Sequence, residues 1–456
     1  TIDEVLKKIK GMFAFALWDR KTRQLHLVRD RLGIKPLYYG WRGQTFMFAS
    51  ELRAIETYPE FDNGIDRRAL ALYLRFSYVP APWSILSGIK KVMPGSILTT
   101  DGRGRNETST TYWSLREVAE KGLQTPFRGS EKDATDRLEK LLREATRQRM
   151  IADVPLGVFL SGGIDSSTIA ALMQSESTSP IKSFTIGFPD HTFDESNQAT
   201  AVAAHLGTNH QILPVTGQDA LDTIPGLPAL CDEPFADSSQ IPTYLVSSLA
   251  RQQVKVCLSG DGGDEVFGGY NRYAWCEPIF EKLRYSPFAI RNLLGKSISA
   301  LSSNTWNRLF EAIHHSLPEA WKLRDPGDKM VKLAHVLSSR NGIDAYKRLV
   351  SQWQFPADVA INCIEPLTII EHSETWPNLP DLTRQMMYLD TMTYLPDDIL
   401  AKLDRASMAW SLEARVPMLD HRVLEYAWSL PQSMKISKGM TKQILRRVLE
   451  KYVPAE

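Results

Sequence analysis

The chain of 456 residues has only four cysteines, at positions 231, 257, 276 and 363. They lie far apart, without the close spacing of a metal site or a redox motif. Isolated cysteines of this kind usually fill space inside proteins of a reducing compartment. We therefore predict four free thiols and a cytoplasmic location.

Long hydrophobic runs and an excess of charge of one sign are also missing. No apolar stretch approaches the roughly 20 residues that a helix needs to cross a bilayer. The 54 Lys and Arg residues balance 53 Asp and Glu residues, so the net charge is only +1. There is thus no electrostatic basis for binding nucleic acid or an anionic membrane, and we predict neither partner.

The most informative stretch is residues 157–167, which reads GVFLSGGIDSS. Its apolar run predicts a buried strand, and Ser166 opens an apolar helical pattern. Backbone N–H groups at the start of a helix lack intrahelical partners, and the helix dipole favours an anion there. We predict a phosphate site in which Asp165 and the phosphates share Mg²⁺. From this stretch alone, a glycine turn without a ligand stays open.

A second glycine-rich stretch, residues 258–270, reads LSGDGGDEVFGGY. Glycine costs about 1 kcal/mol relative to alanine inside a helix, so packing alone does not explain five glycines here. They indicate a site that a ligand or another backbone approaches closely. Asp264 is a candidate second Mg²⁺ ligand, whereas we expect Glu265 to cap a helix.

Further strand-like runs, 181–188 and 255–260, alternate with helical patterns. This alternation favours an α/β fold with a doubly wound parallel sheet, which binds ligands beyond the carboxyl ends of its strands. The two glycine-rich turns and the end of the 181–188 run are therefore expected to face one crevice. From 277 to 392 the chain is rich in Leu and Trp and is predicted to be helical.

Lys442 follows Thr441 at the start of another helical pattern. With Thr441 as the cap, Lys442 would lie in the first turn, where its charge opposes the helix dipole. This placement predicts an anionic ligand, although an exposed helix lysine remains an alternative. The charged segments 395–409 and 413–420 have three- and four-residue spacings, which also suit ordinary surface pairs.

The first hundred residues are rich in strand patterns, and the length of the chain favours two domains. We predict a helix over 1–9 and strands over 12–18, 24–29 and 45–49. The charged loop 29–39 suits either an anion site or scaffold ion pairing, and we favour the scaffold. The polar, aperiodic stretch 116–130 is the predicted linker between domains 1–115 and 131–456.

Together these motifs resemble those of the asparagine synthetase family. Residues 161–166 resemble the PP-loop of ATP pyrophosphatases, and the Gly-Lys-Ser/Thr sequence of a Walker A loop is absent. The stretch 258–270 and the charged segments resemble the synthetase domain. The N-terminal motifs resemble the later half of the glutaminase domain, and they are Gly11–Ala16, Arg29–Asp30, Gly33, Pro36–Tyr39 and Phe48–Glu51.

The resemblance implies a partial N-terminal-nucleophile (αββα) glutaminase domain followed by a PP-loop ATP pyrophosphatase domain with a helical C-terminal part. It implies that aspartate is adenylated by ATP and that ammonia then displaces AMP. Mg²⁺ would be held by Asp165 and Asp264, and Lys442 and Asp261 would be catalytic, although several members carry Glu at the latter position. The implied ATP-binding residues are Phe159, Ser161, Gly162, Gly163, Asp165, Ser166, Ile186, Ser259 and Gly260.

The glutaminase part departs from the family, whose nucleophile is an N-terminal cysteine. The earliest cysteine here is Cys231, so we expect a fragment truncated at both ends that uses free ammonia, whereas the intact protein uses glutamine. A homodimer is a further expectation. Two alternatives remain open: adenylation of another carboxylate, as in relatives that close β-lactams or cyclise peptides, and an inactive scaffold.

Overall fold

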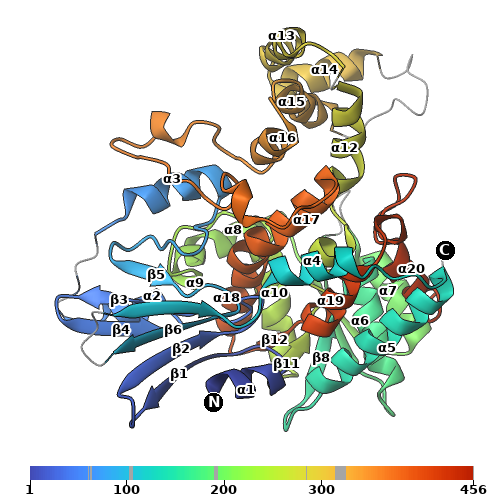
Figure 1. Ribbon diagram of the computed structural model, residues 1–456. Helices are drawn as coiled ribbons and strands as arrows, with labels where there is room; N and C mark the ends of the chain where they lie inside the picture. Colours follow the sequence, from blue (N-terminus) through green and yellow to red (C-terminus); the bar gives the residue numbers. More distant parts are fainter. Residues whose placement is uncertain are drawn as a thin grey trace.

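The computed structural model describes residues 1–59, 61, 64–101, 106–188, 194–283, 285–313 and 325–454. Figure 1 shows antiparallel sheets in the N-terminal part, a separate group of strands flanked by helices, and further helices at one end. Within the described part of the chain, no helix is both long and apolar enough to span a membrane.

The N-terminal part consists of two antiparallel sheets. One has the strand order β1-β2-β6-β7 and the other β4-β3-β5. The predicted strands 24–29 and 45–49 coincide with β2 and β4. The elements are α1 (Ile2–Lys8), β1 (Ala14–Asp19), β2 (Gln24–Arg29), β3 (Tyr38–Arg42), β4 (Thr45–Ala49), α2 (Leu52–Glu56), α3 (Arg67–Phe76), β5 (Ile89–Lys91), β6 (Ser96–Asp101) and β7 (Glu107–Thr111).

The charged loop 29–39 is part of the scaffold. Asp30 is buried and accepts backbone N–H groups of Ile34 and Lys35, both at 2.9 Å. The Arg29 guanidinium donates to backbone carbonyl oxygens, among them that of Val92 at 2.9 Å. Arg29 and Asp30 therefore hold the loop through backbone groups, whereas Lys35 forms an ion pair of the kind that we expected, with Asp404 at 2.7 Å.

The second part contains the predicted parallel sheet. Its five strands have the order β10-β9-β8-β11-β12, and all neighbours are parallel. The chain order reverses between β8 and β11, and ligands bind at such a reversal in open α/β sheets. The strands are β8 (Leu156–Phe159), β9 (Lys182–Gly187), β10 (Asn209–Pro214), β11 (Val256–Leu258) and β12 (Glu413–Arg415).

Helices enclose this sheet and continue into the helical end of the molecule. α10 packs on β9 and on α18, whereas α6 contacts α5, α7 and α20. The helices are α5 (Glu131–Arg149), α6 (Ile164–Ser175), α7 (Ser196–Leu206), α8 (Gly217–Thr223), α9 (Leu227–Leu230), α10 (Gln240–Arg251), α11 (Gly263–Phe267), α12 (Asn271–Leu283), α13 (Phe288–Ser299), α14 (Ser303–Ile313), α15 (Pro326–Leu337), α16 (Gly342–Leu349), α17 (Leu382–Met392), α18 (Leu400–Met408), α19 (His421–Ser429) and α20 (Gln443–Leu449).

A helix also lies within the stretch that was predicted as an irregular linker. α4 (Leu115–Gln124) begins after Ser114, whose side chain caps it, and packs against α19. Its buried positions are Leu115, Ala119 and Gly122, a narrow stripe in an otherwise polar sequence. Because the stripe is so narrow, the periodicity did not reveal the helix, and the domain boundaries at 116–130 remain a prediction.

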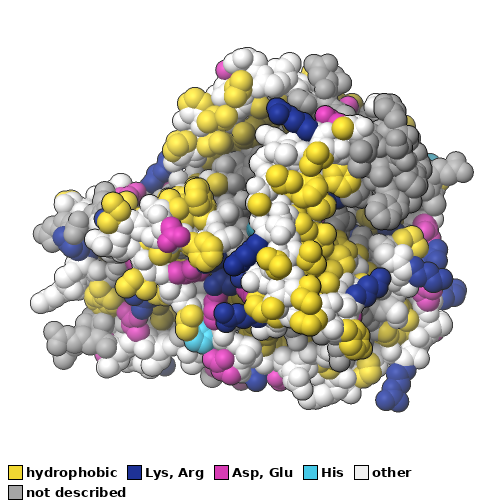
Figure 2. All heavy atoms as spheres, turned by 90° about the horizontal axis from the view of Figure 1, so that it is seen from above, with side chains coloured by type: hydrophobic (Ala, Val, Ile, Leu, Met, Phe, Trp, Pro, Cys, Tyr) yellow, Lys and Arg dark blue, Asp and Glu magenta, His cyan; other side chains and the backbone are white. Residues whose placement is uncertain are grey.

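The helical end carries an exposed apolar surface. In α13, Ile290, Leu293 and Leu294 are more than half exposed, at 55%, 67% and 52%. Figure 2 shows many hydrophobic side chains on the face of the molecule seen from above. This surface lies outside the parallel sheet that carries the glycine-rich turns.

Candidate active site

A cavity of about 550 Å³ lies at the carboxyl ends of the central strands β8 and β11. It is lined by the turn after β8, the turn after β11 and residues of β9 and α10. The predicted site residues that line it are Phe159, Ser161, Gly163, Asp165, Ser166, Ile186, Ser259, Gly260, Asp261, Asp264 and Lys442. The fold thus brings together residues that are up to 283 positions apart in the sequence.

Gly162 is the predicted residue that does not line this cavity. It has a φ of +79°, and an added Cβ would lie 2.7 Å from the backbone nitrogen of Ala199. Its glycine is therefore required by the turn and by close packing against α7. The prediction that it contacts ATP remains a prediction.

The turn after β8 presents hydrogen-bond donors to the cavity. α6 begins after Gly163, and no side chain caps its first turn. The hydroxyl groups of Ser161 and Ser166 lie 3.0 Å apart, and Ser166 also donates to the carbonyl of Gly163. An uncapped helix start beside two hydroxyl groups provides the donors that a phosphate group requires.

Lys442 forms ion pairs with both predicted metal ligands. Its Nζ lies 2.5 Å from Asp165 Oδ2 and 2.7 Å from Asp264 Oδ1. Burial lowers the pKa of Lys442, but the two carboxylates outweigh it, so the pKa ends above its ordinary value. The lysine is therefore a cation beside the turn after β8.

Asp165 retains one oxygen for a further ligand. Burial raises the pKa of Asp165 to about 7, although the Lys442 charge acts in the opposite direction. Its Oδ1 is buried and has no hydrogen-bond partner within the described part of the chain. This free oxygen and Asp264 fit a magnesium ion that takes its remaining ligands from phosphate and water. The described residues contain no group of three or more His, Cys, Asp or Glu that could hold a metal by itself.

Close packing explains two glycines of the second motif. An added Cβ at Gly263 would lie 2.4 Å from Cγ of Asp165, and one at Gly269 would lie 1.9 Å from Oδ1 of Asp264. The Cβ at Gly269 would also lie 2.0 Å from Cε of Lys442. These glycines make room for the three charged side chains, as the composition of the motif predicted.

The rest of the cavity lining divides into an apolar part and a polar turn. Phe159, Ile186, Phe188 and Val246 provide apolar surface suited to a nucleobase. In the turn after β11, the Ser259 hydroxyl donates to the Asp261 carboxylate. This hydrogen bond orients the Asp261 side chain, which lines the cavity.

Two local predictions were wrong. Lys442 is itself the residue that precedes α20, and it has a left-handed φ of 55°, so Thr441 is not the cap. Glu265 does not cap α11, which begins after Gly262. Glu265 is buried inside that helix and accepts a hydrogen bond from the Tyr270 hydroxyl at 2.5 Å. Burial and the neighbouring Asp264 raise the pKa of Glu265 to about 8.

Comparison with known protein families covers both parts of the chain. The profile of the asparagine synthase family matches residues 137–456, and that of the glutamine amidotransferase domain matches residues 3–113. The chain belongs to the asparagine synthase family.

Its relatives are longer than this chain. A putative glutamine-hydrolysing asparagine synthetase of Mycobacterium tuberculosis is 34% identical over 99% of this chain, which spans 66% of that protein. The glutamine-hydrolysing asparagine synthetase 1 of Bacillus subtilis is 32% identical over 99% of this chain and is covered to 67%. Amidase chry2 of Gibberella zeae is 28% identical over 99% of this chain, which covers 68% of it.

The charged segments of this family member, 395–409 and 413–420, have three different surroundings. Lys402 Nζ lies 3.2 Å from Asp237 and 2.8 Å from the hydroxyl of Ser239, which lines the cavity. Asp404 pairs with Lys35 of the N-terminal part at 2.7 Å. The end of the second segment belongs to a network at the start of α19, whose residues are not among those that line the cavity.

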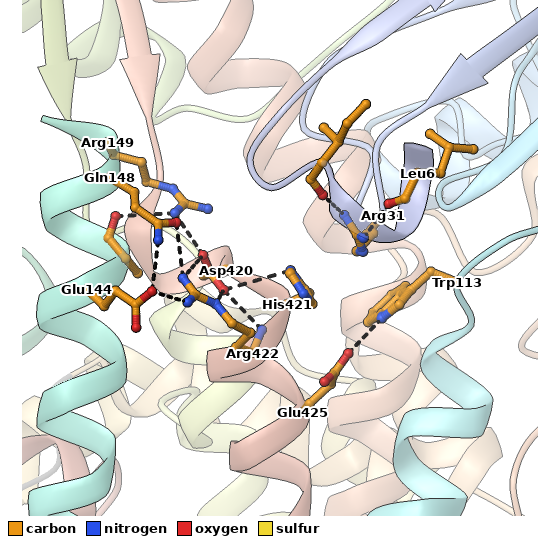
Figure 3. A network of polar contacts seen from close by, with 12 residues as sticks. Leu6, Arg31, Trp113, Glu144, Gln148, Arg149, Asp420, His421, Arg422 and Glu425 are labelled. Carbon is orange, nitrogen blue, oxygen red and sulfur yellow. Dashed lines mark hydrogen bonds and ion pairs between the residues drawn. The ribbon is translucent and has the colours of Figure 1, made fainter. Parts of the chain in front are cut away.

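That network is shown in Figure 3, where Asp420 lies between the side chains of Arg149 and Arg422. Asp420 Oδ2 is 3.0 Å from Arg149, and its Oδ1 is 2.8 Å from Arg422. Arg422 also pairs with Glu144 of α5 at 2.5 Å. The network therefore fastens α19 to α5, which is a structural role.

Sequence reasoning missed several residues of the cavity. Ser239, Thr243 and Tyr270 line it, and Asp237 contacts Ser239 from the far side. The sequence signal that was available is the run Asp237-Ser238-Ser239 directly before α10, in which polar residues precede a helix as they do after β8.

Proposed function

We propose that this chain is an ATP-dependent carbon–nitrogen ligase that adenylates the side-chain carboxylate of aspartate and forms asparagine. The observation that supports this most is the position of Lys442, between two aspartates and beside the uncapped start of α6. A cation and free N–H donors in a cavity with an apolar wall suit a nucleotide whose phosphates react.

In the proposed reaction, a carboxylate oxygen of aspartate attacks the α-phosphorus of ATP and the bond to pyrophosphate breaks. Lys442 and the N–H groups at the start of α6 balance the charge that moves onto the leaving pyrophosphate. Magnesium, held by Asp165 and Asp264, would neutralise part of that charge when bound. Asp261, which accepts a hydrogen bond from the Ser259 hydroxyl, is the residue that we assign to the acyl adenylate.

The second half-reaction transfers nitrogen. Ammonia attacks the acyl carbon of the aspartyl adenylate, loses a proton and releases AMP. The match of residues 3–113 to a glutamine amidotransferase domain supports glutamine as the nitrogen source of the longer protein. For residues 1–456 alone we propose free ammonia as the donor.

Exchange of labelled pyrophosphate into ATP tests the adenylation. We expect exchange that depends on aspartate and magnesium, with AMP as the nucleotide product once ammonia is added. Formation of ADP, or exchange that ignores aspartate, would contradict the proposal. Release of glutamate from glutamine by this polypeptide would contradict the assignment of its nitrogen donor.

A second candidate is adenylation of a different carboxylate within the same family. This candidate is supported by the similarity of nearly the whole chain to a protein named as an amidase. The same exchange assay with other amino acids and peptides separates the two, because the true acceptor gives the highest kcat/KM. An inactive scaffold would not bind Mg-ATP, so a binding measurement tests this alternative. The ion pairs of Lys442 with Asp165 and Asp264 argue against an inactive scaffold.

The cell location and assembly are also proposals. All four cysteines are free thiols, which supports the cytoplasm as the location. We propose a homodimer, and light scattering of the purified chain tests it directly.

A further inference from the structure

One carboxyl group in the cavity after β8 and β11, which we call the ATP cavity, has no role in the proposed reaction. Asp165 and Asp264 pair with Lys442, and Asp261 is assigned to the acyl adenylate. Glu265 lines the same cavity, although it is only 1% exposed. Because it does not cap α11, its place in the cavity calls for another explanation.

The Glu265 carboxyl group has one satisfied and one unsatisfied oxygen. Its Oε1 accepts a hydrogen bond from the Tyr270 hydroxyl at 2.5 Å, and Tyr270 also lines the ATP cavity. Its Oε2 is buried and has no hydrogen-bond partner among the described residues. A buried carboxyl oxygen without a donor is costly. A ligand that brings a donor to Oε2 would remove this cost.

The charges around Glu265 favour a donor that is itself positive. Of the charged side chains that the structure describes, Asp264 and Asp390 act most strongly on this carboxyl group, and both are negative. Lys442, the cation of the cavity lining, pairs with Asp165 and Asp264 instead. A cation at Oε2 would be attracted by this group of carboxylates. It would also favour the ionised form of Glu265, because an opposite charge stabilises a carboxylate.

The position of Glu265 suits the acceptor better than the nucleotide. The apolar wall of the cavity comes from β8, β9 and α10, whereas Glu265 belongs to α11, which follows β11 on the other side of β8. The residue before it, Asp264, pairs with Lys442 at 2.7 Å. A nucleotide with its base on the apolar wall and its phosphates beside Lys442 therefore leaves the region of Glu265 to the acceptor.

We propose that the Glu265 carboxylate binds the ammonium group of the acceptor amino acid through Oε2, while the reacting carboxylate of the acceptor lies beside Lys442. Tyr270 holds the Glu265 side chain in place through Oε1. This assignment rests on the proposed function, because it names the second contact of the acceptor. It makes Glu265 the residue that distinguishes an amino acid from the same carboxylic acid without its amino group.

The kinetic test uses residues 1–456 and the exchange of pyrophosphate into ATP. Glu265→Gln keeps the shape of the side chain and the acceptor for the Tyr270 hydroxyl, but it removes the negative charge. We expect the KM for aspartate to rise by about tenfold or more, since a charged hydrogen bond is lost. The KM for ATP should not change. Succinate, which is aspartate without its amino group, should inhibit the variant and the wild type with the same constant.

Two further variants complete this test. Glu265→Asp should recover part of the aspartate affinity, because the charge remains on a shorter side chain. The matched control is Glu120→Gln, which removes the same charge from α4, where Glu120 pairs with Arg116 at 3.0 Å. This control should leave every KM unchanged.

An aspartate KM of Glu265→Gln within about twofold of wild type overturns the proposed contact. Equal increases in the KM for ATP and for aspartate also overturn it, because Glu265 would then act through the neighbouring Asp264. A raised KM for ammonia in the overall reaction, with an unchanged KM for aspartate, would assign Glu265 to the nitrogen donor instead. These results leave the adenylation of aspartate intact, whereas wild-type exchange that ignores aspartate overturns the proposed function together with this contact.

A structural test does not depend on turnover or on the folding of a variant. The wild-type chain is crystallised with magnesium, aspartate and an ATP analogue in which a methylene group replaces the oxygen between the α- and β-phosphates, so that pyrophosphate cannot leave. We expect the aspartate nitrogen within about 3.2 Å of Glu265 Oε2. An aspartate nitrogen placed against another group, or a cavity without aspartate, overturns the proposal.

Discussion

At the scale of single residues, Lys442 decides how the site is charged. It is the cation paired with both Asp165 and Asp264, and it follows the turn after β8 by 277 positions. A Walker lysine would lie in the phosphate loop itself. Here the positive charge comes from Lys442 at the start of α20. The proposed phosphate loop and the cation beside it therefore lie in different segments of the chain.

Replacing Lys442 tests this division of roles. In Lys442→Met the side chain keeps its bulk but loses its charge, and we expect exchange of pyrophosphate to fall by about 100- to 1000-fold, as on loss of one transition-state donor. Lys442→Arg should retain part of the rate because the charge remains. An exchange rate for Lys442→Met close to wild type would remove Lys442 from the proposed mechanism.

Gly269 offers a test of how closely the site is packed. In Gly269→Ala the new Cβ meets Asp264 Oδ1 at 1.9 Å and Lys442 Cε at 2.0 Å, so both side chains must shift. Displacement of reacting groups by about 1 Å costs about 100-fold in rate, which we expect in the exchange assay. Gly217→Ala is the control, because an added Cβ there has nothing within 4 Å. Equal rates for the two variants would contradict the packing argument.

At the scale of elements, the start of α19 depends on one buried carboxylate. Asp420 caps this helix by accepting the backbone N–H of Arg422, and it pairs with Arg149 of α5. Burial raises the pKa of Asp420, but the hydrogen bonds and charges of Arg422 and Arg149 outweigh it and hold the pKa well below its usual range. The folded state therefore binds this proton less tightly than the unfolded state does.

Asp420→Asn should lower the free energy of unfolding by about 3–5 kcal/mol at pH 7, because the buried Arg149 loses its partner. The depressed folded pKa stabilises wild type fully above the unfolded pKa of about 3.9, and this contribution is lost as the pH falls. The difference between the two proteins should therefore narrow below about pH 4. Urea unfolding at several pH values measures it, and a difference that is constant with pH would contradict the ion-pair account.

At the scale of the whole molecule, ion pairs join the N-terminal sheets to the ATP-binding part. Arg405 of α18 lies 3.1 Å from Glu51 and donates to the carbonyl of Ser50 at 2.6 Å. Lys35 pairs with Asp404 in the same region. These contacts hold the two parts together at α18, which also carries Lys402 beside the cavity.

Arg405→Met should weaken the contact between the N-terminal sheets and α18 while each part stays folded. In differential scanning calorimetry we expect one thermal transition for wild type and two for Arg405→Met, because fewer contacts couple the parts in the variant. Arg116→Met is the matched control, since Arg116 pairs only with Glu120 of its own helix among the contacts described. A single transition shared by both variants would show that apolar packing, not Arg405, couples the parts.

The sequence by itself determined the elements with strong local signals. The strands β2 and β4 coincide with their predicted ranges. The two glycine-rich turns were identified as one site because parallel strands bring their carboxyl ends together. Local patterns suffice where a periodic apolar face or a glycine turn sets the backbone.

The tertiary structure alone decided which charges have partners. The sequence shows Asp397, Asp398, Lys402 and Asp404 within eight positions, yet Lys402 pairs with Asp237 and Asp404 with Lys35, whereas Asp398 Oδ1 has no hydrogen-bond partner among the described residues. A pairing depends on which distant helix or loop packs opposite each side chain, and helix spacing carries no information about that. For the same reason only the folded chain shows that Lys442 meets Asp165 and Asp264.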